Sequence, residues 1–561
     1  MKEDVKGLYA AIFLSAVAIL AVNWIWPAGE MVEEKPVAEV KIAADVPVEV
    51  KKDAEDKLYT PSNRKIEEVE DALKQDKRVK IENDKINGSI RVKGARIDNL
   101  YLNKYKKTLE ENSPSVELLS PAGTLDPYYA EFGWLSNDNS VKVPDSNTKW
   151  NVIGDKLTAQ TPITLEWNNG SGVKFISRIS LDDNYMFNIE QIVENNSGKN
   201  ITLFPYGMVN RVFIAEGNSA VVHEGMLGVV DGKLREFKPS DLDEGEKKEF
   251  TSQGGWTGFG ERYWFSAFAL NNASNSNVRF SKTAKDTYQT DFVGSAVEIA
   301  NGSVATNKSL FFAGAKEISL LDDYAEKYDI KKFDLAVDFG WYYFLTKPFF
   351  YILDFLYKMI GNMGWAILVF AALLRLAMFP IANKSYESMS KMKKVQPKIQ
   401  AIQEKYKDDK VRLQQAMMEL YKKEKINPAS GCLPMFIQIP VFFSLYKVLN
   451  IAIEIRHAEF IGWIKDLSAP DPMTISYMTG ISLPAFLNIG VWPILMGITM
   501  FLQQKLSPKP TNKDQARMFA LMPIFFMFML GQFASGLVIY WTLSNVLSII
   551  QQKAIMKKVG A

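Results

Sequence analysis

The sequence GNMGWAILVFAALLRLAMFP, residues 361–380, decides what kind of protein this chain forms. It is mostly apolar, and an α-helix of about 20 residues, rising ~1.5 Å per residue, covers a hydrocarbon core of roughly 30 Å. One charged side chain, Arg375, lies inside it. A guanidinium within a membrane helix costs roughly 2.5–3.5 kcal/mol on insertion scales, so it needs a polar partner or water. The stretch therefore predicts a membrane helix that carries a buried positive charge.

The whole-chain composition hides two regions of different character. The 561 residues carry a net charge of only +2, and they are too many for one domain. The first 350 residues are polar and mixed in charge, whereas the rest alternate between apolar segments and Lys-rich loops. A single cysteine, Cys432, and two histidines, His223 and His457, leave little material for a disulfide framework, a metal site or a Ser-His triad. We therefore expect no metal, no cofactor and no enzymatic centre.

The N-terminal segment is a second apolar stretch. Residues 8–26 are close to the length of a membrane span, and no small-x-small cleavage site follows before Pro27. Trp24 and Trp26 fit the aromatic belt at a membrane interface. These features predict an uncleaved signal anchor over residues 1–28, with a cleaved signal peptide as the alternative. The Pro-, Val- and Glu-rich residues 29–58 show no period and predict a flexible linker.

Residues 59–330 predict a soluble all-β sandwich. Apolar and polar residues alternate over 173–181 and 185–194, as in half-buried strands. Turn signals separate such runs, among them Asn169-Gly170, Asp231-Gly232 and Asn301-Gly302. A helix is expected near 320–328. The glycine-rich residues 254–260 lack the strand-then-helix context of a phosphate loop, so nucleotide binding is not expected.

Residues 333–347 (FDLAVDFGWYYFLTK) are amphipathic and rich in aromatics. The segment is too polar to span a membrane, so we expect a helix in the plane of the interface that leads into the membrane part, residues 348–561. The alternative is a helix that caps the soluble domain.

A basic loop follows the first core span. Residues 381–430 contain twelve Lys or Arg against six Asp or Glu, which predicts a cytoplasmic location. Apolar residues recur at coiled-coil spacing at Met392, Val395, Ile399, Ile402 and Tyr406, and again at Leu413, Met417 and Leu420. We expect a helical hairpin over 384–426, in which Asp408 or Asp409 caps the second arm and Pro397 kinks or begins the first. Its candidate docking residues are Met392, Lys393, Lys394, Lys398, Lys405 and Lys407; the alternative is a solvated loop without a partner.

Four more membrane helices are expected after the hairpin, at about residues 431–453, 485–504, 518–533 and 536–553. Basic residues after 504 and after 553 place those ends in the cytoplasm. The expected fold class is therefore a six-span helical membrane bundle, five spans forming its core, with an external β-sandwich, a cytoplasmic hairpin and both termini inside.

Polarity within the predicted spans is unusual. No Asp or Glu stands near Arg375 in the sequence of the spans, and the polar residues there are the neutral Gln438, Gln532, Ser544 and Asn545. An arginine among such groups predicts a hydrated pocket, open to the cytoplasm, that attracts polar or anionic guests. The alternatives are snorkelling of Arg375 to the headgroups and ordinary helix–helix hydrogen bonds.

Six segments of the last 200 residues resemble the YidC family of membrane-protein insertases. They are LLRLAMFP (373–380), MKKVQPKIQAIQ (392–403), KKEKINPASGCLPMFIQIPVFFSLYK (422–447), WIKDLSAPDPM (463–473), PILMGITMF (493–501) and SGLVIYWTLSNV (535–546). The resemblance implies an inner-membrane protein of the Gram-negative type, with a periplasmic β-supersandwich at residues 59–330.

The resemblance also implies roles for particular residues. The family's groove arginine and glutamine correspond to Arg375 and Gln438. Its substrate-sliding faces correspond to Ile439, Phe442, Tyr540 and Trp541. Two departures are visible: Ala371 replaces a threonine that relatives often have, and the tail lacks a long basic extension. Residues 474–491 have no assigned role.

The expected function is that of a non-enzymatic insertase and chaperone for nascent inner-membrane proteins. The implied partners are nascent chains, transiently the ribosome, Sec translocon components and lipids, without specific nucleic-acid binding and with the monomer as the active form. Two rival functions remain open, namely a secondary transporter that uses Arg375 and a periplasmic peptide-binding factor for envelope assembly.

Overall fold

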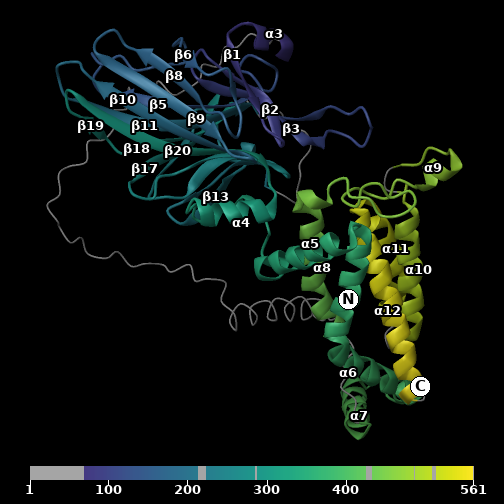
Figure 1. Cartoon of the computed structure of the whole chain (residues 1–561). Coiled ribbons are helices and arrows are strands. Elements are labelled where there is room, and N and C mark those ends of the chain that lie inside the picture. Colours follow the sequence, from purple (N-terminus) through teal and green to yellow (C-terminus); the bar gives the residue numbers. More distant parts are fainter. Residues whose placement is uncertain are drawn as a thin grey trace, which may run out of the picture. The chain divides into compact units, whose positions relative to one another are not determined.

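The computed structural model describes residues 68–212, 223–284, 287–407, 409–424, 433–484, 487–507 and 513–559 (Figure 1). All of them belong to one compact unit, Val48–Ala561. The signal anchor predicted at 1–28 and the linker predicted at 29–58 lie outside the described residues.

Two large sheets form the N-terminal domain. In spatial order, the first sheet contains β14 (Lys247–Ser252), β17 (Ser276–Ala284), β18 (Thr287–Gly294), β11 (Ile201–Val212), β5 (Tyr128–Ser136), β3 (Arg96–Lys106), β2 (Ile86–Arg91), β1 (Arg78–Glu82) and β7 (Lys156–Leu157), with β19 (Val297–Ile299) beside β11 and β4 (Ser115–Leu119) beside β3. The second contains β13 (Lys233–Phe237), β12 (Gly225–Val230), β15 (Trp256–Gly260), β16 (Trp264–Ala269), β20 (Ser303–Ala315), β10 (Met186–Asn195), β9 (Val173–Leu181), β8 (Ile163–Asn168) and β6 (Asn151–Ile153). The prediction of a β-sandwich is confirmed.

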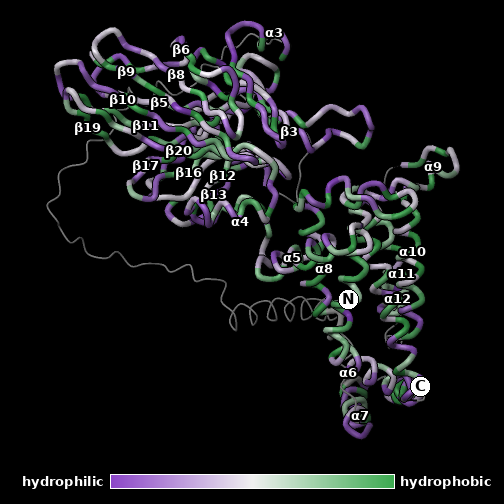
Figure 2. Tube along the Cα trace, in the orientation of Figure 1, coloured by the Kyte–Doolittle hydropathy of each residue, from purple (hydrophilic) through white to green (hydrophobic). Residues whose placement is uncertain are grey.

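The sandwich forms because its strands carry one apolar face. In β9, buried residues alternate with partly or fully exposed ones along the whole strand, as the sequence pattern predicts. Figure 2 shows this alternation as short green and purple segments along many strands. The buried faces meet in an aromatic core in which the ring centroids of Phe268 and Phe311 are 4.7 Å apart. Trp256 and Phe265 are fully buried in the same core.

Short helices flank the strands and lead out of the sandwich. They are α3 (Val69–Lys74), η2 (Pro239–Asp241), α4 (Ile318–Lys327) and η3 (Phe333–Ala336), followed by α5 (Tyr343–Ile360). The helix expected near 320–328 is therefore present as α4. The amphipathic helix expected at 333–347 has different bounds, because only a 3-10 turn forms first and the long helix begins at Tyr343 and continues past Pro348. Its apolar residues Phe344, Phe355 and Met359 are largely exposed.

Helices dominate the rest of the described chain. They are α6 (Met363–Lys405), α7 (Lys410–Lys423), α8 (Leu433–Ile451), η5 (Ile453–Ile455), α9 (Ile475–Thr479), α10 (Val491–Leu506), α11 (Lys513–Met529), η6 (Leu530–Gln532) and α12 (Ser535–Val559). By length and composition, α6 is the one helix of the described chain that qualifies to cross a membrane, and 436–451 of α8 is a shorter apolar helix. The count of six spans therefore stays a prediction.

The 43-residue helix α6 unites the predicted span with the first arm of the hairpin. It begins where the Asn362 side chain accepts a hydrogen bond from the Trp365 backbone N–H at 3.1 Å. It then continues through Pro380 and Pro397 without a break in the helix. Pro397 therefore neither begins nor ends the arm. The described helix is a single element that joins the apolar stretch to the basic one.

The second arm, α7, packs on the end of α6. Val395 and Ile399 are buried against a group of apolar residues, Met392, Met417, Leu420 and Tyr421. Asp409 caps α7 by accepting from the Arg412 backbone N–H at 3.0 Å. Lys398 and Glu424 form an ion pair at 2.7 Å between the arms. The seam spacing thus corresponds to real contacts, and the cytoplasmic location of the hairpin stays a prediction.

Candidate functional site

The guanidinium of Arg375 is held by a hydroxyl group of another helix. Its Nε and Nη2 atoms donate to Ser544 Oγ on α12, at 3.1 and 2.7 Å. Arg375 is half-buried, and Ser544 is buried. No ion pair between Arg375 and an Asp or Glu occurs among the described residues. The cation therefore faces a neutral acceptor, which is the arrangement that the lack of acidic residues in the spans predicts.

A second polar contact lies one helical turn away on α12. Tyr540 precedes Ser544 by four residues and so shares its face. Gln438 Nε2 of α8 donates to Tyr540 Oη at 3.0 Å. Tyr540 is buried, while Gln438 is half-buried. The structure thus brings Arg375, Ser544, Tyr540 and Gln438 onto three facing helices, α6, α8 and α12.

Apolar side chains adjoin this polar group. The ring centroids of Phe442 on α8 and Trp541 on α12 are 4.7 Å apart in an edge-to-face arrangement. The ring centroid of Phe526 on α11 also lies 5.8 Å from that of Trp541. Ile439 is 41% exposed although it lies in an apolar helix. The predicted sliding residues on α8 and α12 are therefore neighbours, and Ile439 is open to the surroundings.

Of the predicted groove residues, Asn545 points elsewhere. Asn545 is buried and donates through Nδ2 to Thr499 Oγ1 of α10 at 3.1 Å, so it ties α12 to α10. Gln532 is exposed in η6, before α12 begins. Asn545 is a case of the helix–helix hydrogen bond that the sequence analysis kept as an alternative.

Sequence analysis overlooked a polar contact beside the end of the predicted span. Gln551 Nε2 of α12 donates to Asn383 Oδ1 of α6 at 2.8 Å. The same amide also reaches the Phe379 carbonyl at 3.4 Å. Gln551 lies seven residues after Ser544, which is two helical turns along the same face. That spacing was the signal that could have predicted the contact. The sequence analysis used the end of α12 only for the charge of its basic tail.

The hairpin presents basic side chains to its surroundings. Of its candidate docking residues, Met392 and Lys393 are half-buried, while the exposed ones are Lys394, Lys398, Lys405 and Lys407. Lys398 is already paired with Glu424 across the two arms. The remaining lysines stand on a basic surface at the end of α6.

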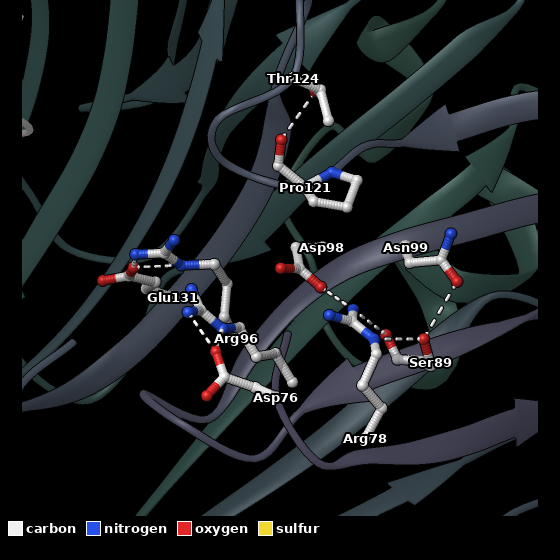
Figure 3. A network of polar contacts seen from close by, with 10 residues as sticks. Asp76, Arg78, Ser89, Arg96, Asp98, Asn99, Pro121, Thr124 and Glu131 are labelled. Atoms are coloured by element: carbon white, nitrogen blue, oxygen red, sulfur yellow. Dashed lines mark hydrogen bonds and ion pairs between the residues drawn. The ribbon is translucent and has the colours of Figure 1, made fainter. Parts of the chain in front are cut away.

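The sandwich carries a rival polar cluster, shown in Figure 3. Arg96 pairs with Glu131, and Arg78 pairs with Asp98. All four side chains are at most 10% exposed. Burial raises the pKa of Asp98, and the neighbouring arginines oppose that shift. Each carboxylate has its own arginine, so the charges cancel in pairs. No group of three or more potential metal ligands occurs in the described part of the chain. The cluster thus resembles a structural network more than a reactive site.

The fold and the site together define a class of protein: a helical bundle with a cation facing hydroxyl and amide groups, preceded by a β-sandwich. The family model "60Kd inner membrane protein" matches residues 355–561, and the model "YidC periplasmic domain" matches residues 78–352. The membrane protein insertase YidC of Rickettsia rickettsii (strain Sheila Smith) is 45% identical over 99% of this chain and 100% of its own length. The corresponding protein of Rickettsia felis is 44% identical over the same shares.

A crystal structure of an active YidC insertase with its first transmembrane domain resolved covers 85% of this chain and 92% of its own, at 17% identity and a TM-score of 0.37. The family models and the relatives show that this chain belongs to the YidC family. The resemblance inferred from the sequence is confirmed.

Proposed function

We propose that this protein inserts nascent membrane proteins into the inner membrane and assists their folding, through the site around Arg375. Its membership of a family whose curated relatives are named membrane protein insertases supports this function. The single observation that carries the mechanism is the contact of Arg375 with Ser544, in which the cation has a neutral partner.

The chemistry of the site suits the polar flank of an arriving segment. Moving such a flank into a membrane is costly because its charges and amides lose water. Arg375 and Ser544 can replace part of that water by electrostatic attraction and hydrogen bonding, which are stronger in a poorly solvated site than in water. The site therefore lowers the barrier for the flank without a covalent reaction.

The apolar part of the substrate would follow the greasy surface of α8 and α12. Ile439, Phe442 and Trp541 lie along this surface. Each Leu, Ile, Phe or Val that enters the membrane centre gains roughly 0.3–0.6 kcal/mol. A segment of about 20 apolar residues therefore drives its own insertion, and no nucleotide is needed.

The topology and the wider partners belong to the same proposal. The proposed arrangement has six spans, a cytoplasmic hairpin that meets the ribosome transiently, and cooperation with Sec components. The exposed lysines of the hairpin support the proposed contact with the ribosome. A basic surface attracts the phosphate backbone of ribosomal RNA without reading its sequence.

Site-specific photo-crosslinking tests the function. A photoreactive phenylalanine replaces Ile439 or Trp541 in the full chain, and ribosomes stalled on a nascent membrane protein supply the substrate. Ile550 is the matched control, because it is exposed on α12 and lies nine residues from Trp541, on the opposite side of the helix.

We expect crosslinks from 439 and 541 to the nascent segment, and weak ones from 550. Equal crosslinking from all three positions would contradict a groove on α8 and α12. A transporter of small anions would give no crosslink to a nascent chain at all.

A further inference from the structure

Helix α9 lies in a loop that is closed at its base by hydrogen bonds of its own backbone, before α10 begins. Thr474 and Gly490 form an isolated antiparallel bridge, and the Ile475 N–H donates to the Ile489 carbonyl at 3.0 Å. The Ser476 N–H donates to Asn488 Oδ1 at 2.9 Å. Residues 474–476 are therefore joined to residues 488–490, directly before α10 begins at Val491. We call these joined segments the neck of the loop.

A buried carboxylate fixes the neck. Asp471 is only 3% exposed, and its Oδ1 accepts from the Trp463 indole N–H at 2.9 Å and from the Met473 N–H at 3.0 Å. Its Oδ2 accepts from the Trp492 N–H, in the first turn of α10, at 2.8 Å. A Cβ on Gly490 would come within 2.5 Å of Asp471, so only glycine allows this close approach. The neck is thus bound rigidly to the start of α10.

The tip of the loop displays apolar side chains. Tyr477 is 74% exposed, Met478 is 50% exposed and Ile481 is 61% exposed. The short helix α9 holds the first two, and Gly480 ends it in the left-handed conformation at φ 72°. The loop is thus built to present large apolar side chains outward, and such a patch indicates an apolar partner.

The charge pattern indicates what the partner is. Residues 472–504 contain no Lys, Arg, Asp, Glu or His, whereas the loop before them, 454–471, carries six Asp, Glu, Lys or Arg residues. A loop that faces water or a polar protein surface has no reason to exclude charge. An uncharged loop that is continuous with an apolar helix, and has Trp463 and Trp492 at its base, has the composition of a membrane interface.

We propose that the tip of this loop, with Tyr477, Met478 and Ile481, inserts into the headgroup–acyl boundary of the outer leaflet. The partner is the lipid surface itself, and the loop fixes the depth of the outer end of α10 because the Asp471 neck joins the two. The inference rests on the proposed topology, in which Val491 lies at the outer end of a spanning α10.

Depth-dependent fluorescence quenching tests the proposal in the full chain. Cys432→Ser removes the single native thiol, and Met478→Cys or Ile481→Cys carries an NBD probe. Ile153→Cys is the reference, since Ile153 is an exposed apolar residue in β6 of the sandwich. Each protein is reconstituted in phosphatidylethanolamine–phosphatidylglycerol vesicles, with or without a lipid that carries a shallow doxyl group, and iodide reports exposure to water.

We expect the doxyl lipid to reduce the emission at 478 and 481 by about twofold, with little effect of iodide, and the reverse at 153. Ile481→Asp should weaken the doxyl effect at 478, because a carboxylate resists entry into the boundary. Iodide quenching at 478 and 481 equal to that at 153 would overturn the proposal. Protection from both quenchers would overturn it too, since a protein would then cover the tip. No substrate is present, so a failure here is distinct from a failure of the crosslinking experiment.

Discussion

At the scale of single residues, the candidate site depends on which group accepts the hydrogen bonds of the Arg375 guanidinium. A buried guanidinium paired with a carboxylate would be neutralised and would attract a polar guest only weakly. Arg375 instead donates to the hydroxyl of Ser544, so its charge remains available. A neutral partner is what the proposed site for polar segments requires, and it distinguishes the Arg375 contact from a structural ion pair.

Substituting Ser544 tests this contact. Ser544→Ala removes the acceptor of both Arg375 hydrogen bonds and should destabilise the protein by about 1–3 kcal/mol, because a hydrogen bond to a charged group is lost in a buried place. The measurement is the thermal unfolding midpoint in detergent, together with insertion of a reporter membrane protein. Ser548→Ala is the matched control, since the Ser548 hydroxyl donates to the Ser544 carbonyl of its own helix at 2.7 Å. Equal effects of the two variants would contradict a special role for the Arg375 contact.

Glu454 makes stability depend on pH. It lies in η5, beyond the end of α8, and its Oε2 is buried without a hydrogen-bond partner among the described residues. Burial, with Glu317 and Asp354 nearby, raises its pKa from 4.5 to about 7. Between these two values the folded protein holds a proton that the unfolded chain has lost. The free energy of unfolding therefore falls as the pH rises from 4.5 to about 7, and this contribution is constant above that.

Glu454→Gln removes this dependence because the amide is neutral at every pH. We expect the variant to gain up to about 3 kcal/mol over the parent at pH 8, and to lose that advantage near pH 4.5. Thermal unfolding between pH 4.5 and 8 provides the measurement. Glu459→Gln is the control, as Glu459 is exposed and pairs with Lys465 at 3.4 Å. A constant difference between Glu454→Gln and the parent across this range would refute the assignment.

At the scale of elements, α6 combines two environments in one helix. Its first half is apolar, and its second half carries the seam that packs on α7. The helix is continuous through Pro380 and Pro397, so the segment with Arg375 and the seam belong to one element.

The seam between α6 and α7 can be broken selectively. Ile399 is 3% exposed and packs in the cluster with Met417 and Leu420, so Ile399→Asp buries a charge without a partner and should separate the arms. We expect trypsin to cleave α7 at least about tenfold faster, since roughly 1.4 kcal/mol of lost seam stability already raises the open population tenfold. Ala401→Asp is the control because Ala401 is exposed on the same helix. Unchanged cleavage in Ile399→Asp would show that the arms do not depend on the seam.

At the scale of the whole molecule, the candidate site belongs to the bundle and not to the sandwich. The groups that form the candidate site lie on α6, α8 and α12, and their hydrogen bonds stay within the bundle. Apolar residues of both regions belong to one buried cluster, and polar contacts also join the regions. Arg262 Nε of the sandwich donates to the Asn450 carbonyl at 2.6 Å, and Arg456 Nη2 donates to the Lys106 carbonyl at 2.7 Å.

Deleting residues 60–320 therefore separates the functional hypotheses. An insertase whose site lies on the bundle should retain most of its insertion activity, measured with a reporter protein in vesicles at matched protein levels. A periplasmic peptide-binding factor would lose its role entirely. Loss of insertion with normal expression and folding of the remaining chain would place the function in the sandwich.

Patterns of residues close together in the sequence determined several helices and strands and the family of this protein. Alternation at period two predicted β9 and β10, and the spacing of three and four residues predicted the seam of α6 and α7. Six short segments of the last 200 residues, taken together, were enough to identify the family. These features are readable because each depends on residues close together in the chain.

Only the tertiary structure decided which polar groups meet. Arg375 and Ser544 are 169 positions apart, and Gln438 and Tyr540 are 102 apart. Ser544 and Asn545 are adjacent, yet one turns to α6 and the other to Thr499 of α10. Periodicity fixes which residues share a face of one helix, but the rotation of that helix about its axis depends on how all its neighbours pack. For that reason the sequence supplied the candidate groups, and the packing of the helices chose among them.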